Sequence, residues 1–128
     1  MLNQISIMGR LTKDPELRYT SNNTPVAAFT IACDRDVSSN GEKQTDFFNC
    51  VAWRATGEFV SKYFAKGTLI SLIGRLQMRS YESRDGERRQ TVEIVVDKAY
   101  FCGERKKEDV PAKKPKFIDV DDDEQLPF

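Results

Sequence analysis

The sequence predicts a small all-β domain containing one helix, followed by a polar tail. Up to Phe101, most segments alternate apolar and polar residues, which is the period of a half-buried strand. Only residues 55–65 space their apolar side chains as a helix does. With 128 residues and 39 % apolar content, the chain is long enough for one hydrophobic core.

The first two strands are expected over residues 3–11 and 26–33, where alternation and β-forming residues dominate. Asp14-Pro15 ends the first of them, and Ser21-Asn22-Asn23 is typical of a turn. Asn40-Gly41 then predicts a turn at the tip of a long loop or hairpin.

A third strand is expected over residues 45–53, and its two faces differ clearly. One face carries Phe48, Cys50 and Ala52, and the other carries Phe47, Asn49, Val51 and Trp53. The helix over residues 55–65 follows it directly. Its apolar stripe consists of Phe59, Val60, Tyr63 and Phe64, and Gly67 is placed as a C-terminal cap.

Two long strands complete the domain. In residues 69–81, the expected core face carries Ile70, Leu72, Leu76 and Met78, and the opposite face carries Arg75, Gln77, Arg79 and Tyr81. Arg84-Asp85-Gly86 predicts a hairpin tip, and the strand over residues 91–101 carries Val92, Ile94 and Val96. Five strands with one helix between the third and fourth is the order of an OB-fold, a partly open five-stranded Greek-key barrel.

The charge of the chain is zero in total but is unevenly distributed. Residues 1–103, the predicted domain, carry a net charge of +2. Residues 104–118 carry +3 and are too polar to bury a core, so a disordered linker is expected. Residues 119–128 carry five acids and no base, which sets them apart as a third region.

The composition argues against an enzyme. Histidine, the commonest general base, is absent. Cys33, Cys50 and Cys102 show no spacing typical of a zinc site or a disulfide framework, so reduced thiols are expected. Neither a signal peptide nor an apolar run long enough for a membrane span is visible, which favours a cytoplasmic protein without cofactor, metal or membrane partner.

Three aromatic residues lie on strand faces opposite the expected core. Phe47, Trp53 and Tyr81 occupy these positions, and Arg75 and Arg79 share the face of Tyr81. Exposed aromatics among cations suit single-stranded nucleic acid, since bases stack on the rings and cations neutralise phosphates. The alternative is that these rings pack under a loop or in a subunit interface.

Scattered cations give a second, weaker signal, because each one alone is typical of a solvated surface. A net charge of +2 predicts a local path for a phosphate backbone instead of a uniformly basic surface. The residues assigned to phosphate contacts are Arg10, Lys13, Arg18, Arg54, Lys62, Lys66, Arg75, Arg79 and Arg84.

The last ten residues have the form of a linear recognition peptide. Their acids could suggest Mg²⁺ binding, but a segment without a scaffold does not fix octahedral geometry. Two large apolar groups and the α-carboxylate follow the acids, and a solubilising tail does not account for them. The expected partner-binding residues are Asp119, Asp121, Asp122, Asp123, Glu124, Leu126, Pro127 and Phe128.

Several short motifs in order make the chain similar to a known family. They are Asn3-Gln4-Ile5 to Gly9-Arg10-Leu11, Asp14-Pro15-Glu16-Leu17-Arg18-Tyr19, Thr45-Asp46-Phe47, Trp53, Tyr63-x-x-Lys66-Gly67, Gly74-Arg75-Leu76 and the acidic end. Together they resemble the bacterial single-stranded DNA-binding proteins. The resemblance covers residues 1–103 almost without gaps and resumes at 119–128.

The resemblance implies stacking of bases on Phe47, Trp53 and Tyr81, a homotetramer, and a role in replication, recombination and repair near the nucleoid. It also implies that replication and repair proteins bind residues 119–128. Where the family can carry a further stacking tryptophan, this chain has Asp34-Arg35-Asp36-Val37. Glu124-Gln125 within the acidic end and a short linker are further departures from the family pattern.

Two other functions compete with this interpretation. An OB-type RNA-binding or translation module would prefer rU over dT oligomers of equal length. A nuclease would cleave a labelled oligomer in the presence of a metal, although the absence of histidine disfavours it.

Overall fold

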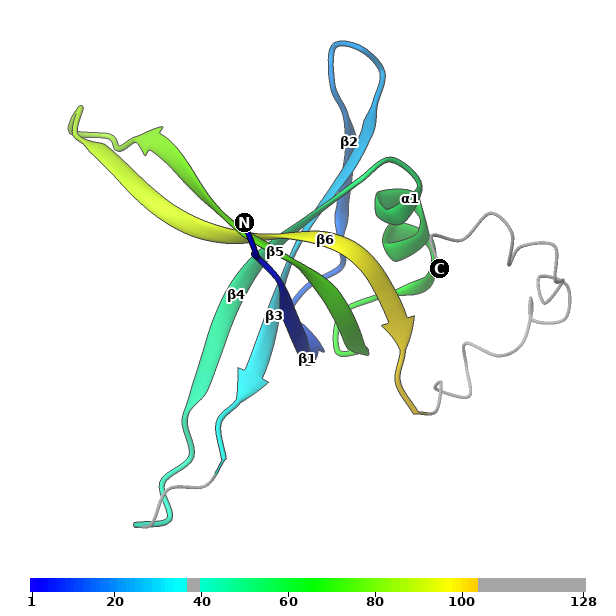
Figure 1. The fold of residues 1–128 in the computed structure, drawn as a ribbon, viewed down its shortest axis with the longest axis vertical. Coiled ribbons are helices and arrows are strands. Elements are labelled where there is room, and N and C mark those ends of the chain that lie inside the picture. Colours follow the sequence, from blue (N-terminus) through cyan, green and yellow to red (C-terminus); the bar gives the residue numbers. More distant parts are fainter. Residues whose placement is uncertain (37–39, 104–128) are drawn as a thin grey trace, which may run out of the picture.

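The computed structural model describes residues 1–36 and 40–103 as one barrel (Figure 1). Its elements are β1 (Ile5–Leu11), β2 (Glu16–Tyr19), β3 (Pro25–Asp34), β4 (Thr45–Trp53), α1 (Arg54–Tyr63), β5 (Leu69–Glu82) and β6 (Arg88–Phe101). The strands form one sheet in the order β1-β5-β6-β4-β3-β2, and an added β1–β3 pairing closes it. Only β4 and β6 run parallel. The strand-rich barrel with a single helix before β5 confirms the predicted fold class.

β2 is a sixth strand that the sequence did not predict. It pairs antiparallel with the start of β3, and the turn between them includes Asn23 at φ 66°. The turn itself was expected at this position. β2 has only four residues and is largely exposed, so it lacks the apolar alternation that reveals a longer strand.

The core lies between α1 and the inner face of the sheet. It consists of Leu11, Phe29, Ile31, Cys50, Ala52, Phe59, Val60, Phe64, Ile70, Leu72, Ile94, Val96 and Ala99. The predicted helical stripe is confirmed, since Phe59, Val60 and Phe64 are all buried. Within the described residues, no helix is long and apolar enough to span a bilayer.

The ends of α1 differ slightly from the prediction. The helix begins at Arg54 and ends at Tyr63, and its C-cap, Phe64, has an extended backbone. Gly67 therefore does not cap it. Instead, Gly67 adopts φ 87° in the following turn, where its N–H donates to the carbonyl of Leu11 at 2.8 Å. This bond ties the turn before β5 to the end of β1.

Two long hairpins, β3–β4 and β5–β6, extend from the barrel as separate arms (Figure 1). Leu76 and Met78 on β5 and Val92 on β6 are about half exposed. The prediction that Leu76 and Met78 face the core was wrong. The alternation continues along both strands, but here they have left the barrel, and no residue in the described ranges buries their apolar face.

A bulge marks the point where the β5–β6 arm leaves the barrel. The ladder pairs Ile73 with Lys98 but Gly74 with Val96, so Asp97 has no partner in the register. A Cβ at Gly74 would lie 2.2 Å from the carbonyl oxygen of Val95, so only glycine fits there. The extra residue bends β6 and sets the direction of the arm.

Candidate nucleic-acid interface

The outer face of β4 presents two large aromatic rings. Cys50 and Ala52 are buried on the core side, whereas Phe47 and Trp53 are 65 % and 43 % exposed. This confirms the predicted division of the strand. The two rings are six residues apart, or roughly 20 Å along an extended strand, so they form separate platforms.

The register of the sheet places an arginine on the same face as each ring. Trp53 pairs with Val26, which in turn pairs with Arg18 of β2. Phe47 pairs with Ala32, which pairs with Arg10 of β1. Since directly opposed residues project from the same face of a sheet, each aromatic shares its face with an arginine two strands away.

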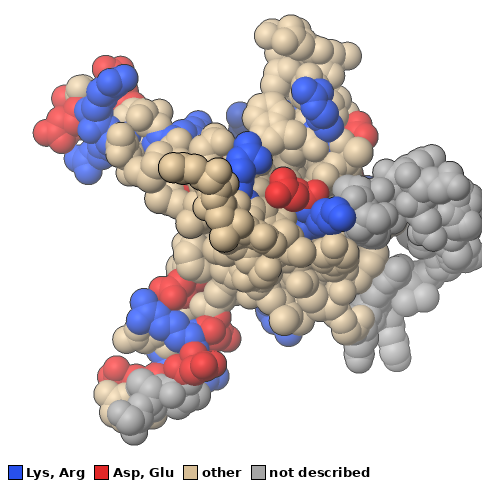
Figure 2. Space-filling view, in the orientation of Figure 1, with Lys and Arg blue, Asp and Glu red and all other residues tan. Residues whose placement is uncertain are grey.

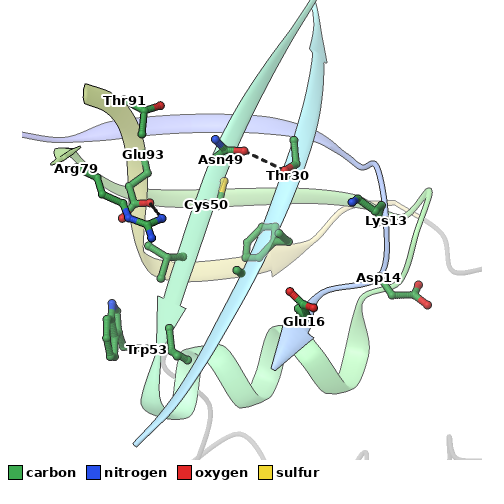
Figure 3. A pocket seen from close by; sticks show the side chains of 14 residues that line it. Lys13, Asp14, Glu16, Thr30, Asn49, Cys50, Trp53, Arg79, Thr91 and Glu93 are labelled. Atoms are coloured by element: carbon green, nitrogen blue, oxygen red, sulfur yellow. Dashed lines mark hydrogen bonds and ion pairs between the residues drawn. The ribbon is translucent and has the colours of Figure 1, made fainter. Parts of the chain in front are cut away.

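A groove of about 620 Å³ lies on this face, within the roughly 300–1,000 Å³ range of ligand clefts. Figure 3 shows Arg79, Thr91 and Glu93 on one side of the β3–β4 ladder and Lys13, Asp14 and Glu16 on the other. Between them, the Thr30 hydroxyl donates to Oδ1 of Asn49 at 3.1 Å. The groove therefore combines a neutral centre with charged sides.

The β5–β6 arm continues this face away from the barrel. On β5 this face carries Arg75, Arg79 and Tyr81, which alternate with residues of the opposite face. Tyr81 is 46 % exposed and pairs with Arg89 of β6. Arg84 lies in the turn at the arm's tip. Figure 2 shows that basic and acidic side chains gather together on both arms. The structure thus brings Tyr81 near several arginines, but these are not isolated positive charges.

Three of the arginines assigned to phosphate contacts form ion pairs within the protein. Arg18 lies 3.2 Å from Glu16, Arg79 lies 3.7 Å from Glu93, and Arg75 lies 3.9 Å from Asp97. A phosphate that binds these guanidinium groups competes with a carboxylate. The net electrostatic gain per contact is then smaller than for a free arginine.

The remaining assigned cations are spread over several elements. Lys13 lines the groove, while Lys66 lies in the turn beside it, where its backbone N–H donates to Oδ1 of Asp14 at 2.8 Å. Arg54 opens α1 at φ 55°, directly after Trp53. Lys62 lies on α1 with its Nζ 5.3 Å from the ring centre of Tyr63, and it is not among the residues that line the groove.

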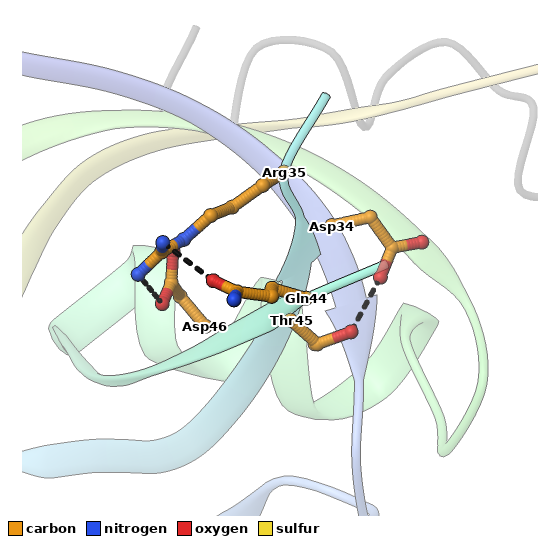
Figure 4. Close-up of polar contacts among 5 residues, drawn as sticks. All are labelled: Asp34, Arg35, Gln44, Thr45 and Asp46. Carbon is orange, nitrogen blue, oxygen red and sulfur yellow. Dashed lines mark hydrogen bonds and ion pairs between the residues drawn. The ribbon is translucent and has the colours of Figure 1, made fainter. Parts of the chain in front are cut away.

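Arg35 lies in the region where the family can carry a further stacking tryptophan and this chain does not. Its guanidinium donates to both oxygens of Asp46, at 2.8 and 3.0 Å, and to Oε1 of Gln44 at 2.7 Å (Figure 4). Hydrogen bonding to Arg35 lowers the pKa of the Asp46 carboxyl. Thr45 also donates to Asp34 at 2.8 Å, so polar contacts join β3 to β4 at the base of the loop.

All three cysteines are free thiols. Burial raises the pKa of Cys50 to about 12, and it also raises the pKa of the partly buried Cys33. Both therefore stay protonated at neutral pH and are poor nucleophiles. This agrees with packing as their role, as the sequence predicted.

Some groove residues were missed by the sequence analysis. Thr30, Asn49, Thr91 and Glu93 line the groove. Asn49 was expected on the outer face of its strand, but none of the four was assigned to the interface. A signal was available for Glu93, because it alternates with Val92 and Ile94 and so had to lie on the face opposite Ile94. The predicted linker and partner-binding residues, 104–118 and 119–128, lie outside the described residues.

Known proteins similar to this chain share one description. "Single-stranded DNA-binding protein" of Enterococcus faecalis is 45 % identical over 98 residues, covering 76 % of this chain and 52 % of its own length. The namesake of Bacillus cereus is 45 % identical over 106 residues, covering 82 % and 62 %. "Single-stranded DNA-binding protein A" of Bacillus subtilis is 46 % identical over 102 residues, covering 79 % and 59 %.

The chain therefore spans between about half and two thirds of the length of these relatives. The family model described as "Single-strand binding protein family" matches residues 2–102, which is the whole barrel and both arms. On this match and these identities, the chain belongs to the single-strand binding protein family.

Proposed function

We propose that the protein binds single-stranded DNA without sequence specificity and does not catalyse a reaction. The observation that carries the proposal is the pair of exposed rings on β4, each sharing its face with an arginine. Aromatic faces accept any base, so stacking on Phe47, Trp53 and Tyr81 gives affinity without sequence preference. The relatives' names, which refer to single-stranded DNA, support the choice of ligand.

A fluorescence titration with dT oligomers tests this function. Trp53 is the only tryptophan, so its emission reports on one platform, and a stacked base should quench it. Duplex DNA of equal length should bind far more weakly because its bases are not free to stack. Saturating binding that leaves the emission unchanged, or equal affinity for duplex and single strand, contradicts the stacking model.

The same titration separates the competing functions. An rU oligomer of equal length that binds better than dT would favour an RNA-binding module. A labelled oligomer incubated with the protein and Mg²⁺ should remain intact, and cleavage would establish a nuclease.

We further propose a homotetramer, in line with the family resemblance. Leu76, Met78 and Val92 form an exposed apolar face on the β5–β6 arm in the described part of the chain. Among the residues that the structure describes, Ile5 to Gly9 of β1 pair with β5 on one side only, which leaves a strand edge available to another copy. Light scattering should give about four times 14.7 kDa, and a monomer at micromolar concentration would remove this proposal.

Residues 119–128 are proposed to recruit replication, recombination and repair proteins, with the protein acting in the cytoplasm at the nucleoid. Acids would attract a basic rim on the partner, while Leu126 and Phe128 fill an apolar pocket. Phe128→Ala, which keeps every acid, should weaken recruitment and leave DNA binding intact. Phe117→Ala in the linker is the matched control, and equal binding by both variants would indicate a merely solubilising tail.

A further inference from the structure

Glu93 differs from the other carboxylates that form ion pairs in the described part of the chain. Its side chain is 14 % exposed, whereas those of its four counterparts are 38–67 % exposed. Its partner, Arg79, is itself 64 % exposed. The carboxylate is therefore recessed in the groove while the guanidinium reaches toward solvent.

The position of Glu93 is fixed by two ladders. It pairs with Asn49 on β4 and with Gln77 on β5, so its side chain shares the groove face with the centre of the β4 strand. Figure 3 shows the carboxylate next to Asn49 and above Trp53, on the same side as Arg79. The nearest groove positions on β3 and β4, including Thr30, are neutral.

The ion pair with Arg79 leaves a negative field inside the groove. The two groups are 3.7 Å apart, longer than a hydrogen bond, and most of the guanidinium faces water, which screens it. The recessed carboxylate is screened less, because solvent has little access to it. An anion that enters the groove therefore meets repulsion at the recessed carboxylate beside Asn49 and attraction from Lys13 and from the exposed guanidinium of Arg79. On the side of Lys13, the carboxylates of Asp14 and Glu16 offset part of that attraction.

We propose that Glu93 sets the orientation of the bound strand by excluding phosphates from the recessed part of the groove beside Asn49, so that bases face the strands there and phosphodiesters stay near Lys13 and the exposed guanidinium of Arg79. This rests on the proposed binding of single-stranded DNA and assigns Glu93 a specificity role. A neutral base meets no repulsion there, whereas a polyanion without accessible bases does. Glu93 thus discriminates against duplex DNA and against backbones that lack bases.

Glu93→Gln in the full chain tests this, because it removes the charge and keeps the shape. Dissociation constants are measured for a dT oligomer, an abasic oligomer of equal length and a duplex. The ratio of abasic to dT affinity should rise about tenfold in Glu93→Gln, the effect of removing one like-charge contact of ~1.4 kcal/mol. Affinity for dT should change much less, and it also reports that the variant is folded.

Glu87→Gln is the matched control. Glu87 also pairs with an arginine, Arg89 at 3.4 Å, but it is 67 % exposed and lies by the tip of the arm. Glu87→Gln changes the net charge by the same amount as Glu93→Gln, so it should shift the affinities for the dT oligomer, the abasic oligomer and the duplex by a similar small factor. Equal rises in the abasic ratio for both variants would overturn the assignment, since net charge alone would then explain the effect.

A second result would also overturn it. If Glu93→Gln weakens dT binding and leaves the abasic ratio unchanged, Glu93 holds Arg79 or a base edge and does not exclude phosphate. Failure of the proposed function looks different, because the wild-type protein would then not bind dT in preference to duplex at all.

Discussion

Gly57 packs α1 against β4, the strand that carries Trp53, and its contacts predict whether alanine at this position raises or lowers the stability of the domain. An ideal Cβ at Gly57 would lie 2.4 Å from the carbonyl oxygen of Ala52 and 3.1 Å from the backbone nitrogen of Ala27. Ordinary van der Waals contact begins at 3.4 Å, so the helix and β4 must separate by about 1 Å. Both atoms are backbone, so no side-chain rotation relieves the contact.

Two effects oppose each other in Gly57→Ala. Alanine in a helix interior is favoured over glycine by ~1 kcal/mol. Overpacking a well-packed contact costs about 1–3 kcal/mol, and a backbone clash belongs at the upper end of that range. We therefore expect a net loss of about 1–2 kcal/mol, equivalent to a fall in Tm of roughly 4–16 °C for a domain of this size.

The assay is thermal unfolding at a fixed protein concentration, since association would otherwise shift Tm. Glu58→Ala, the neighbouring exposed position in the same helix, is the control and should change Tm little. The Ala52 carbonyl belongs to the peptide that continues into Trp53, so Gly57→Ala should also weaken dT binding. A variant with a raised Tm would refute the reasoning, because helix propensity would then outweigh the contact.

Three further predictions follow from the groove and the arms. Trp53→Ala should weaken dT binding about 5- to 150-fold, equivalent to ~1–3 kcal/mol of stacking, while Trp53→Phe keeps most of the affinity; equal affinity of both variants to wild type would exclude Trp53 as a platform. Three of the nine cations assigned to phosphate contacts form ion pairs in the free protein. The slope of log K against log salt, measured with dT oligomers, should therefore be no steeper than about −4 per protomer, and a slope near −6 would mean that all nine contact phosphate. Hydrogen bonding to Arg35 lowers the pKa of Asp46, so the stability that Asp46 contributes is present above its ordinary pKa of 3.8 and is lost as the pH falls through its lowered pKa. The Tm difference between wild type and Asp46→Asn should therefore shrink in acid, and a difference that stays constant with pH would contradict this role of Asp46.

The sequence was informative where a strand has one buried and one open face. Alternation along β4 placed Cys50 inside and Phe47 and Trp53 outside, as the structure has them. The same rule failed for Leu76 and Met78, because period-two patterning reports which residues share a face and says nothing about what covers that face. Coverage depends on where the strand leaves the barrel, which is a property of the whole fold.

Local patterning also could not reveal contacts that only the register creates. The ladders put Arg10 on the same face as Phe47 and Arg18 on the same face as Trp53, although these residues are far apart in the chain. The ion pairs of Arg79 with Glu93 and of Arg75 with Asp97 arise in the same way. The sequence therefore identified the types of residue at the interface but overestimated how many cations are free of partners.

The bulge at Asp97 lies at the base of the β5–β6 arm, so a small change in bend there moves the distant end of the arm by a larger distance. Tyr81 lies seven residues beyond Gly74, or roughly 23 Å along an extended strand. A change of roughly 10° in the bend at the bulge would carry Tyr81 about 4 Å, with the barrel itself unmoved. The bend at Asp97 thus sets the distance between Tyr81 on the arm and the two aromatic rings on β4. A small change in that bend alters the length of the path that a bound strand follows between these rings.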